Sequence, residues 1–247
     1  MQINHIPKVN ARYWTAITMA SIFGTNMGDL YADDAKLGIW LGTSILAAIA
    51  AVVFMVERQD KSPRELYYWL AIIIIRTGAT NIADFVKHQI PWLAFGIILA
   101  VLMAGFAWLS ARGDARQERA SEARGMPSTG VAYWAAMLTA GVLGTFYGDV
   151  ASKLIGQGPA SLTLGAALLG ALFVWKTDSG NRFWLYWGAL AIARSFGTAA
   201  GDWFAESPIV NIGLPLSTMI TGTVFVLILV LWPRQGGAAV PIRATGN

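Results

Sequence analysis

One motif occurs four times in this chain and constrains its fold more than any other feature. Each copy begins with Tyr-Trp and continues with a small residue, Thr, a small residue and Asp at 10, 11, 14 and 15 residues after the Trp. The tryptophans are Trp14, Trp69, Trp134 and Trp187. They lie 55, 65 and 53 residues apart, whereas the spacing inside the motif never changes. Constant spacing inside unequal repeats predicts one rigid unit, and a period near fifty residues predicts a repeat protein.

Long apolar segments indicate the class of protein. Hydrophobic residues make up 55% of the 247 residues and charged residues only 13%, which is not the composition of an ordinary soluble domain. Stretches long enough to cross a bilayer recur along the chain. We expect transmembrane helices over residues 11–30, 36–56, 66–87, 91–111, 131–151, 158–176, 182–204 and 208–232. The sequence therefore predicts an all-α, polytopic membrane protein in which the Asp motif ends every odd-numbered helix.

The repeats also predict the arrangement of these helices. Because each repeat has two helices, each begins on the same face of the membrane, which indicates four parallel helical hairpins about a pseudo-fourfold axis. Arg76 and Arg194, each seven residues after the Trp, occur only in alternate copies, so a pseudo-twofold duplication is superimposed. The halves cover residues 1–111 and 131–232. A cytoplasmic linker over 112–130 and a disordered tail over 233–247 are expected from their polar composition.

The distribution of basic residues predicts the orientation. Of the 18 lysines and arginines, only Lys36, Lys87 and Lys153 lie on the side where the odd helices end, and Arg76 and Arg194 lie inside helices. The others are on the side where the repeats begin. By the positive-inside rule both termini and the linker are cytoplasmic, in a bacterial inner membrane. The net charge of +4 therefore fits topology, and no nucleic-acid partner is expected.

Composition also excludes several chemistries. The chain has no cysteine and two histidines, His5 and His88, so thiolate metal sites, disulfides and haem held by paired histidines are not expected. No cofactor and no enzymatic activity are predicted, because nucleophile, zinc-protease and phosphate-loop motifs are missing from the sequence.

The two small residues of each copy are four residues apart, which places them on one face of a helix. This is the pattern by which membrane helices approach closely. We expect the motif helices to pack on each other, or on their hairpin partners, through this face. The small residues are Gly24, Gly28, Ala79, Ala83, Gly144, Gly148, Gly197 and Gly201.

The threonines and aspartates of the motif carry the candidate chemistry. The threonines are Thr25, Thr80, Thr145 and Thr198, and the aspartates are Asp29, Asp84, Asp149 and Asp202. Each Thr is expected to bind the carbonyl four residues back, or alternatively to act as a neutral ligand or as a partner of the Asp. Each Asp lies ~22 Å from its Trp along the helix, in the outer part of the membrane if Trp marks the interface. The aspartates either cap loops at the outer boundary or converge on a path for a cation or proton.

Arg76 and Arg194 are expected ~10 Å beyond the Trp, near mid-membrane, facing the interior. Pairing with an Asp of a neighbouring repeat is the expected arrangement. Four Asp and two Arg leave a formal charge of −2, which would suit one divalent metal ion bound by the ring of aspartates, or protonation of two acids.

The four Tyr-Trp…Thr-x-x-small-Asp copies resemble a bacterial integral membrane family known only as a repeat of unknown function, with two transmembrane segments and a tryptophan in each repeat. The resemblance covers residues 11–232, although the second copy has Ala79 and Ala83 in place of glycines. It implies the eight-helix architecture and brings no activity or substrate.

Two functions remain open from the sequence. The first is a transporter or permease for a small ion or solute, with a cation favoured and an anion held by the two arginines as the other choice. The second is a non-transporting scaffold or subunit of a membrane complex. The expected partners are the lipid bilayer, a small ion or solute, and a further copy or another membrane protein.

Overall fold

The computed structural model describes residues 6–34, 38–60, 65–87, 89–112, 127, 129–178 and 180–232. Within these residues the chain is entirely helical apart from loops. The elements are α1 (Ala11–Asp29), the π-helix η1 (Leu30–Asp34), α2 (Gly38–Gln59), α3 (Leu66–Val86), α4 (Trp92–Ala111), α6 (Val131–Ile155), α7 (Gln157–Thr177), α8 (Arg182–Glu206) and α9 (Leu214–Leu231). The all-α class is confirmed.

The helix boundaries lie close to the predicted ones, except at the start of α9. This helix begins at Leu214 rather than near residue 208. The loop before it contains Pro208, and Gly213 has φ +80°, a conformation that favours glycine and ends a helical path. The linker predicted over 112–130 and the tail over 233–247 fall almost entirely outside the described residues.

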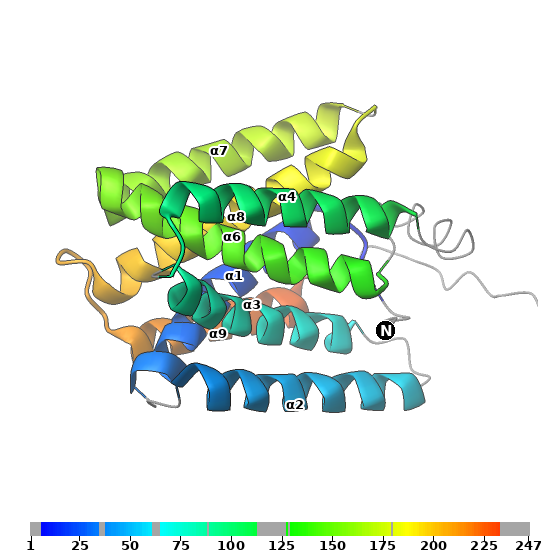
Figure 1. Cartoon of the computed structure of the whole chain (residues 1–247), viewed down its shortest axis with the longest axis horizontal. Helices are drawn as coiled ribbons and strands as arrows, with labels where there is room; N and C mark the ends of the chain where they lie inside the picture. Colours follow the sequence, from blue (N-terminus) through cyan, green and yellow to red (C-terminus); the bar gives the residue numbers. More distant parts are fainter. Residues whose placement is uncertain are drawn as a thin grey trace, which may run out of the picture.

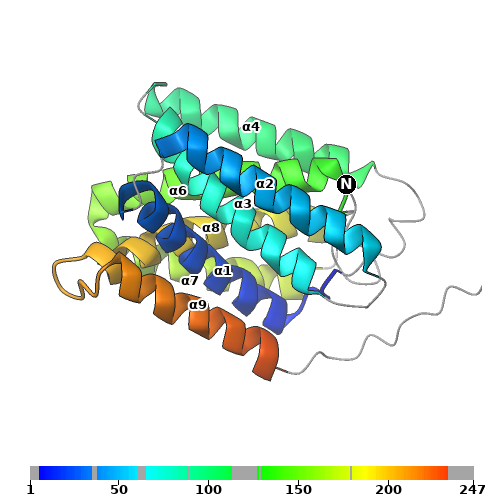
Figure 2. The same cartoon turned by 90° about the horizontal axis from the view of Figure 1, so that it is seen from below.

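The first helices of the four repeats form an inner bundle. α1, α3, α6 and α8 pack in a closed circle, each against two others. All four run in the same direction, as Figures 1 and 2 show. We call their common centre the axis. The parallel, pseudo-fourfold arrangement of the motif helices follows from this circle.

The second helices of the repeats form an outer layer, and each is displaced by one repeat. α2 packs mainly on α3, α4 on α6, α7 on α8, and α9 on α1 (Figures 1 and 2). Of the two predicted modes of packing, contact with the hairpin partner is the smaller one. Every outer helix covers the inner helix of the next repeat, so a single repeat cannot bury its own apolar face. The outer layer is complete only because α9 of the last repeat packs on α1 of the first.

Two hydrogen bonds join α9 to α1 where the circle closes. Near one end, Arg12 donates to the carbonyl oxygen of Leu229 at 3.1 Å. Near the other end, the Asn26 amide donates to the Ser217 hydroxyl at 2.6 Å. The contact between the first and last repeats is therefore fixed at both ends of the helix pair.

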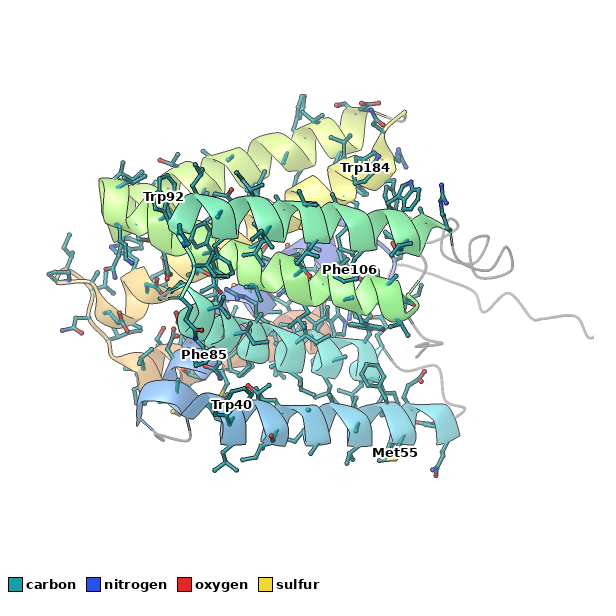
Figure 3. All side chains as sticks on the ribbon, in the orientation of Figure 1. Trp40, Met55, Phe85, Trp92, Phe106 and Trp184 are labelled. Atoms are coloured by element: carbon teal, nitrogen blue, oxygen red, sulfur yellow. The ribbon has the colours of Figure 1, made fainter. Side chains whose placement is uncertain are left out.

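Six helices in the described part of the chain are long and apolar enough to span a membrane: α2, α3, α4, α6, α7 and α9. The four outer helices expose large apolar side chains, and Figure 3 shows Met55 on the side of α2 that faces away from the other helices. α1 and α8 do not reach the same hydropathy because polar residues such as Asn26 and Arg194 interrupt them. Those polar side chains are buried inside the bundle.

The small residues of each inner helix face the next inner helix. A Cβ on any of the six motif glycines would clash with the helix that it faces. The contacts are Gly24 with Arg76, Gly28 with Thr80, Gly144 with Arg194, Gly148 with Thr198, Gly197 with Ser21 and Gly201 with Asn26. The predicted packing of the motif helices on each other through this face is therefore observed.

The second repeat keeps the close approach although it lacks both glycines. Ala79 faces Gly141 of α6, where an added Cβ would lie 2.6 Å from the Cβ of Ala79. Gly141 occupies the same place in its repeat as Arg76 does in the second. The glycine that α3 lacks is thus supplied by the helix that it faces.

We predict that Gly148→Leu destabilises the protein strongly, because the new side chain meets Thr198 and the Ser195 carbonyl oxygen. Forcing extra volume into a packed contact costs at least about 2 kcal/mol. The matched control is Gly170→Leu on α7, where no atom lies near an added Cβ and removal of a helical glycine gains about 1 kcal/mol. Thermal unfolding in detergent tests this, and equal midpoints for the two variants would contradict it.

Candidate functional site

The tyrosines that open the four motifs meet on the axis and form a closed ring of hydrogen bonds. All four are almost completely buried. The hydroxyl distances are 3.1 Å for Tyr13–Tyr68, 2.7 Å for Tyr68–Tyr133, 3.0 Å for Tyr133–Tyr186 and 2.6 Å for Tyr186–Tyr13. Since a hydroxyl donates one hydrogen bond and can accept another, the ring can employ every hydroxyl hydrogen. We call this group the tyrosine ring.

The motif tryptophans surround the tyrosine ring. Each packs on its own Tyr and on the Tyr of the preceding repeat, with ring centroids 5.2 to 5.8 Å apart. Trp14, Trp69, Trp134 and Trp187 are 1–5% exposed. They are therefore core residues that lock neighbouring helices together. Their side chains point into the bundle, whereas the sequence interpretation took the Trp to mark the membrane interface.

Arg76 lies fully buried on the axis, enclosed by the four motif threonines. Its two terminal nitrogens donate to all four hydroxyls and to one backbone carbonyl. The acceptors are Thr80 (3.2 Å), Thr145 (2.8 Å) and the Gly141 carbonyl (3.3 Å) for Nη1, and Thr198 (2.6 Å) and Thr25 for Nη2. We call this arrangement the threonine cage.

The threonine hydroxyls can accept from Arg76 because their own hydrogens are directed elsewhere. Thr25, Thr80 and Thr198 donate to the backbone carbonyls four residues back, at 2.9, 3.4 and 3.3 Å. The carbonyl role predicted for the motif threonines is thus confirmed for three of them. Their other partner is the guanidinium of Arg76 and not the Asp of the motif. The predicted pairing of Thr with Asp is therefore not observed.

Arg194 is equally buried but has far fewer partners. Its Nη1 donates to the Ser21 hydroxyl at 3.2 Å, and its Nη2 points to the sulfur of Met137 at 3.9 Å, which is a weak acceptor. Its Nε has no hydrogen-bond partner. A guanidinium carries five N–H donors. Arg194 is therefore a buried cation, and most of its N–H groups lack a good acceptor.

The arginines are not paired with the aspartates. Among the described residues neither Arg76 nor Arg194 forms an ion pair, and the cause is depth: the Asp follows the Arg by eight residues, about two helical turns. The aspartates gather at the far end of the inner helices, where they interact electrostatically with one another. All four are partly exposed rather than buried in the interior. The expected pairing of each Arg with an Asp of a neighbouring repeat is therefore not observed among the described residues.

Lys87 supplies the positive charge that Arg76 and Arg194 were expected to provide. It follows α3 directly and donates to Asp84 at 2.5 Å and to Asp149 of α6 at 2.8 Å. Burial alone lowers the pKa of Lys87, but the hydrogen bonds and charges of Asp149 and Asp84 outweigh this and raise its pKa above the ordinary value. A raised pKa keeps the ammonium charged at neutral pH, so the lysine side of this link between two inner helices is present there.

The expected metal site at the aspartates is not formed in the part of the chain that the structure describes. No group of three or more His, Cys, Asp or Glu side chains in that part lies close enough together to hold a metal ion. The cationic layers on the axis are built from arginine with neutral oxygen acceptors instead.

The tyrosine ring is the functional feature that sequence reasoning missed. The signal was visible, since a Tyr precedes the Trp in every copy. Four tyrosines at one depth in four parallel helices can meet only on the axis, where each hydroxyl needs a partner.

The comparisons with known proteins agree with the repeat character of the chain. The sequence model of a family described as Repeat of Unknown Function (DUF347) matches residues 12–58 and 185–237. These segments contain α1 with α2 and α8 with α9, the first and last repeats. No curated protein and no solved structure shows significant similarity to the chain.

We predict that Thr145→Val destabilises the protein by about 1–3 kcal/mol, because a charged donor of Arg76 loses its acceptor in a buried site. Thr139→Val is the matched control on the same helix, since its hydroxyl binds only a carbonyl of its own helix, Ala135, at 2.8 Å. Thr145→Ser keeps the hydroxyl and should restore most of the loss. Chemical unfolding in detergent measures all three, and equal losses for the two valine variants would refute the cage.

We predict that the tyrosine ring shows a specific pattern of coupling in double-mutant cycles. Each Tyr→Phe change removes two hydrogen bonds, at a cost of about 2 kcal/mol. The neighbours Tyr133 and Tyr186 share one bond, so their double variant should lose about 1 kcal/mol less than the sum. The diagonal pair Tyr13 and Tyr133 lies across the ring and should couple more weakly than this neighbouring pair. Additivity in both cycles would show that the ring is not closed in the folded protein.

Proposed function

We propose that this chain is a multi-pass membrane protein whose inner bundle forms the path of a small anion through the membrane. Along the axis lie the tyrosine ring, Arg194, Arg76 in the threonine cage and the partly exposed aspartates. Burying polar and charged groups inside a membrane protein costs free energy, and such groups usually line a path for a substrate or ion.

The observation that carries the proposal is the poor hydrogen bonding of Arg194. A guanidinium buried without an acidic partner is costly, and charged groups inside a membrane protein usually mark a substrate or ion path. Arg76 has its acceptors in the threonine cage, whereas Arg194 has only Ser21 and Met137. A small anion beside Arg194 would supply both the missing acceptor and the opposite charge.

The same observation favours an anion over the cation expected from the sequence. That expectation rested on the formal charge of −2 left by four aspartates and two arginines. Instead, two guanidiniums occupy the axis with no carboxylate in ion-pair contact among the described residues. A cation about 8 Å from one guanidinium would be opposed by about 2 kcal/mol.

The proposal includes eight membrane spans. α1 and α8 fall below the hydropathy expected of a span, but their polar side chains face the axis and their lengths of 19 and 25 residues suffice to cross a bilayer. The basic residues on the side where the repeats begin favour cytoplasmic termini in a bacterial inner membrane.

A scaffold or subunit role is the second candidate. The observation in its favour is that the tyrosine ring is closed and fully buried, so the axis is sealed at this level. In that case the polar layers would serve only to fix the register of the inner helices, and the outer surface would bind another copy or another membrane protein.

We expect purified protein in lipid vesicles to pass chloride, nitrate or formate and to exclude potassium. Removing the charge with Arg194→Gln should abolish the anion flux and also the thermal stabilisation that the anion gives in detergent at constant ionic strength. Arg182→Gln is the matched control, an exposed arginine at the start of the same helix. It should leave both measurements unchanged.

Two results would overturn the proposal. The first is anion flux through Arg194→Gln at the rate of the unmodified protein, which would place the path elsewhere. The second is a folded protein that passes none of the three anions and is stabilised by none, which would favour the scaffold.

A further inference from the structure

A separate cavity lies at the side of the bundle, near the end where the aspartates gather. It has a volume of about 300 Å³ and is lined by Lys87, Trp92, Phe146, Asp149, Val150, Lys153 and Leu154. These residues come from the end of α3, the start of α4 and the last part of α6. Neither arginine of the axis contributes to it.

The lining is divided between charge and apolar surface. Lys87, Lys153 and Asp149 give it a net charge of +1, and the other four residues are apolar or aromatic. Lys87 is occupied by its pairs with Asp84 and Asp149. Lys153, in the last turn of α6, is exposed and one turn beyond Asp149. Lys153 is therefore the cation of this cavity that is most accessible to an external anion.

The apolar part of the lining continues onto the surface of the bundle. Trp92 is 65% exposed and Leu154 is 77% exposed. Figure 3 shows Trp92 at the beginning of α4, at the same end of the bundle as Phe85 and Trp40. Tryptophan at the end of an apolar span is characteristic of the boundary between lipid and water. The cavity thus opens where a lipid headgroup meets its acyl chains.

We propose that this cavity binds an anionic phospholipid, with the phosphodiester at Lys153 and Lys87 and an acyl chain along Val150, Leu154 and Trp92. The charges complement each other, since the lining carries +1 and such a lipid carries −1. A free inorganic anion would leave the apolar part of the cavity unused, and an uncharged hydrophobic molecule would leave Lys153 without a partner. Basic side chains close to the membrane surface attract anionic headgroups through their opposite charge.

The consequence for the protein is a connection between lipid and the inner bundle. Lys87 lines the cavity and also joins α3 to α6 through Asp84 and Asp149. A phosphodiester beside Lys87 adds an acceptor to the same ammonium group and so ties α4, which contributes Trp92, to this junction. The lipid would then stabilise the end of the bundle that holds the aspartates.

The test uses the full-length protein in neutral detergent with short-chain phosphatidylglycerol, phosphatidylcholine of equal chain length, or inorganic phosphate. We expect phosphatidylglycerol to raise the thermal midpoint and to remain bound in native mass spectrometry, with little effect of the other two. Lys153→Gln should weaken the binding about fivefold, the effect of one basic residue near a lipid surface. Lys176→Gln is the matched control, an exposed lysine in the last turn of α7 that does not line the cavity.

A second variant separates the cavity from general surface charge. Val150→Trp fills the cavity without changing any charge and should abolish the bound lipid while the protein remains folded. Equal binding of phosphatidylcholine, an equal effect of inorganic phosphate, an equal loss in Lys176→Gln, or unchanged binding in Val150→Trp would each overturn the proposal.

Discussion

The hydrogen bonds from Arg76 to the four motif threonines are the interaction on which the arrangement of the bundle depends. Each repeat supplies one hydroxyl, and one guanidinium binds all four. Because these acceptors must lie at one depth around one group, a shift of any inner helix by a turn would leave a buried charged donor unpaired, at a cost of several kcal/mol. The cage therefore fixes the register of the inner helices, which apolar packing alone would specify weakly.

The threonine cage requires the inner helices to approach closely. The motif allows this because a small residue on one helix faces a different motif position on the next helix. The first small residue of each repeat faces the residue seven after the Trp in the next repeat. Gly24 and Gly144 leave room for Arg76 and Arg194, whereas Ala79 faces Gly141. Arginine at this position thus needs a glycine on the facing helix, which the first and third repeats provide and the second, with Ala79, does not.

Much of the fold could be predicted from the sequence, because periodicity and spacing determine which residues share a depth and a face. The equal Trp-to-Asp spacing predicted four parallel inner helices, and the small residues predicted their contact. Spacing does not show which neighbour a side chain selects. Arg76 binds hydroxyls at its own depth and not carboxylates two turns away. The tryptophans pack on the tyrosine ring. Each outer helix packs on the inner helix of the next repeat. These contacts depend on the desolvation of charged groups and on the closed circle of four repeats. Neither can be read from the sequence of a single repeat.

The duplication of the chain explains why one of the two arginines remains underused. Arg76 and Arg194 are equivalent by sequence, since each stands seven residues after its Trp. The circle, however, offers only one set of four threonines, and Arg76 binds all of them. A second guanidinium in the same cage would find no free acceptor and would be repelled by the first. Arg194 is instead directed to Ser21 and Met137. The fourfold arrangement of threonines therefore satisfies one arginine and leaves the other, Arg194, with few hydrogen-bond acceptors. Under the proposed function, Arg194 is the group to which the anion binds.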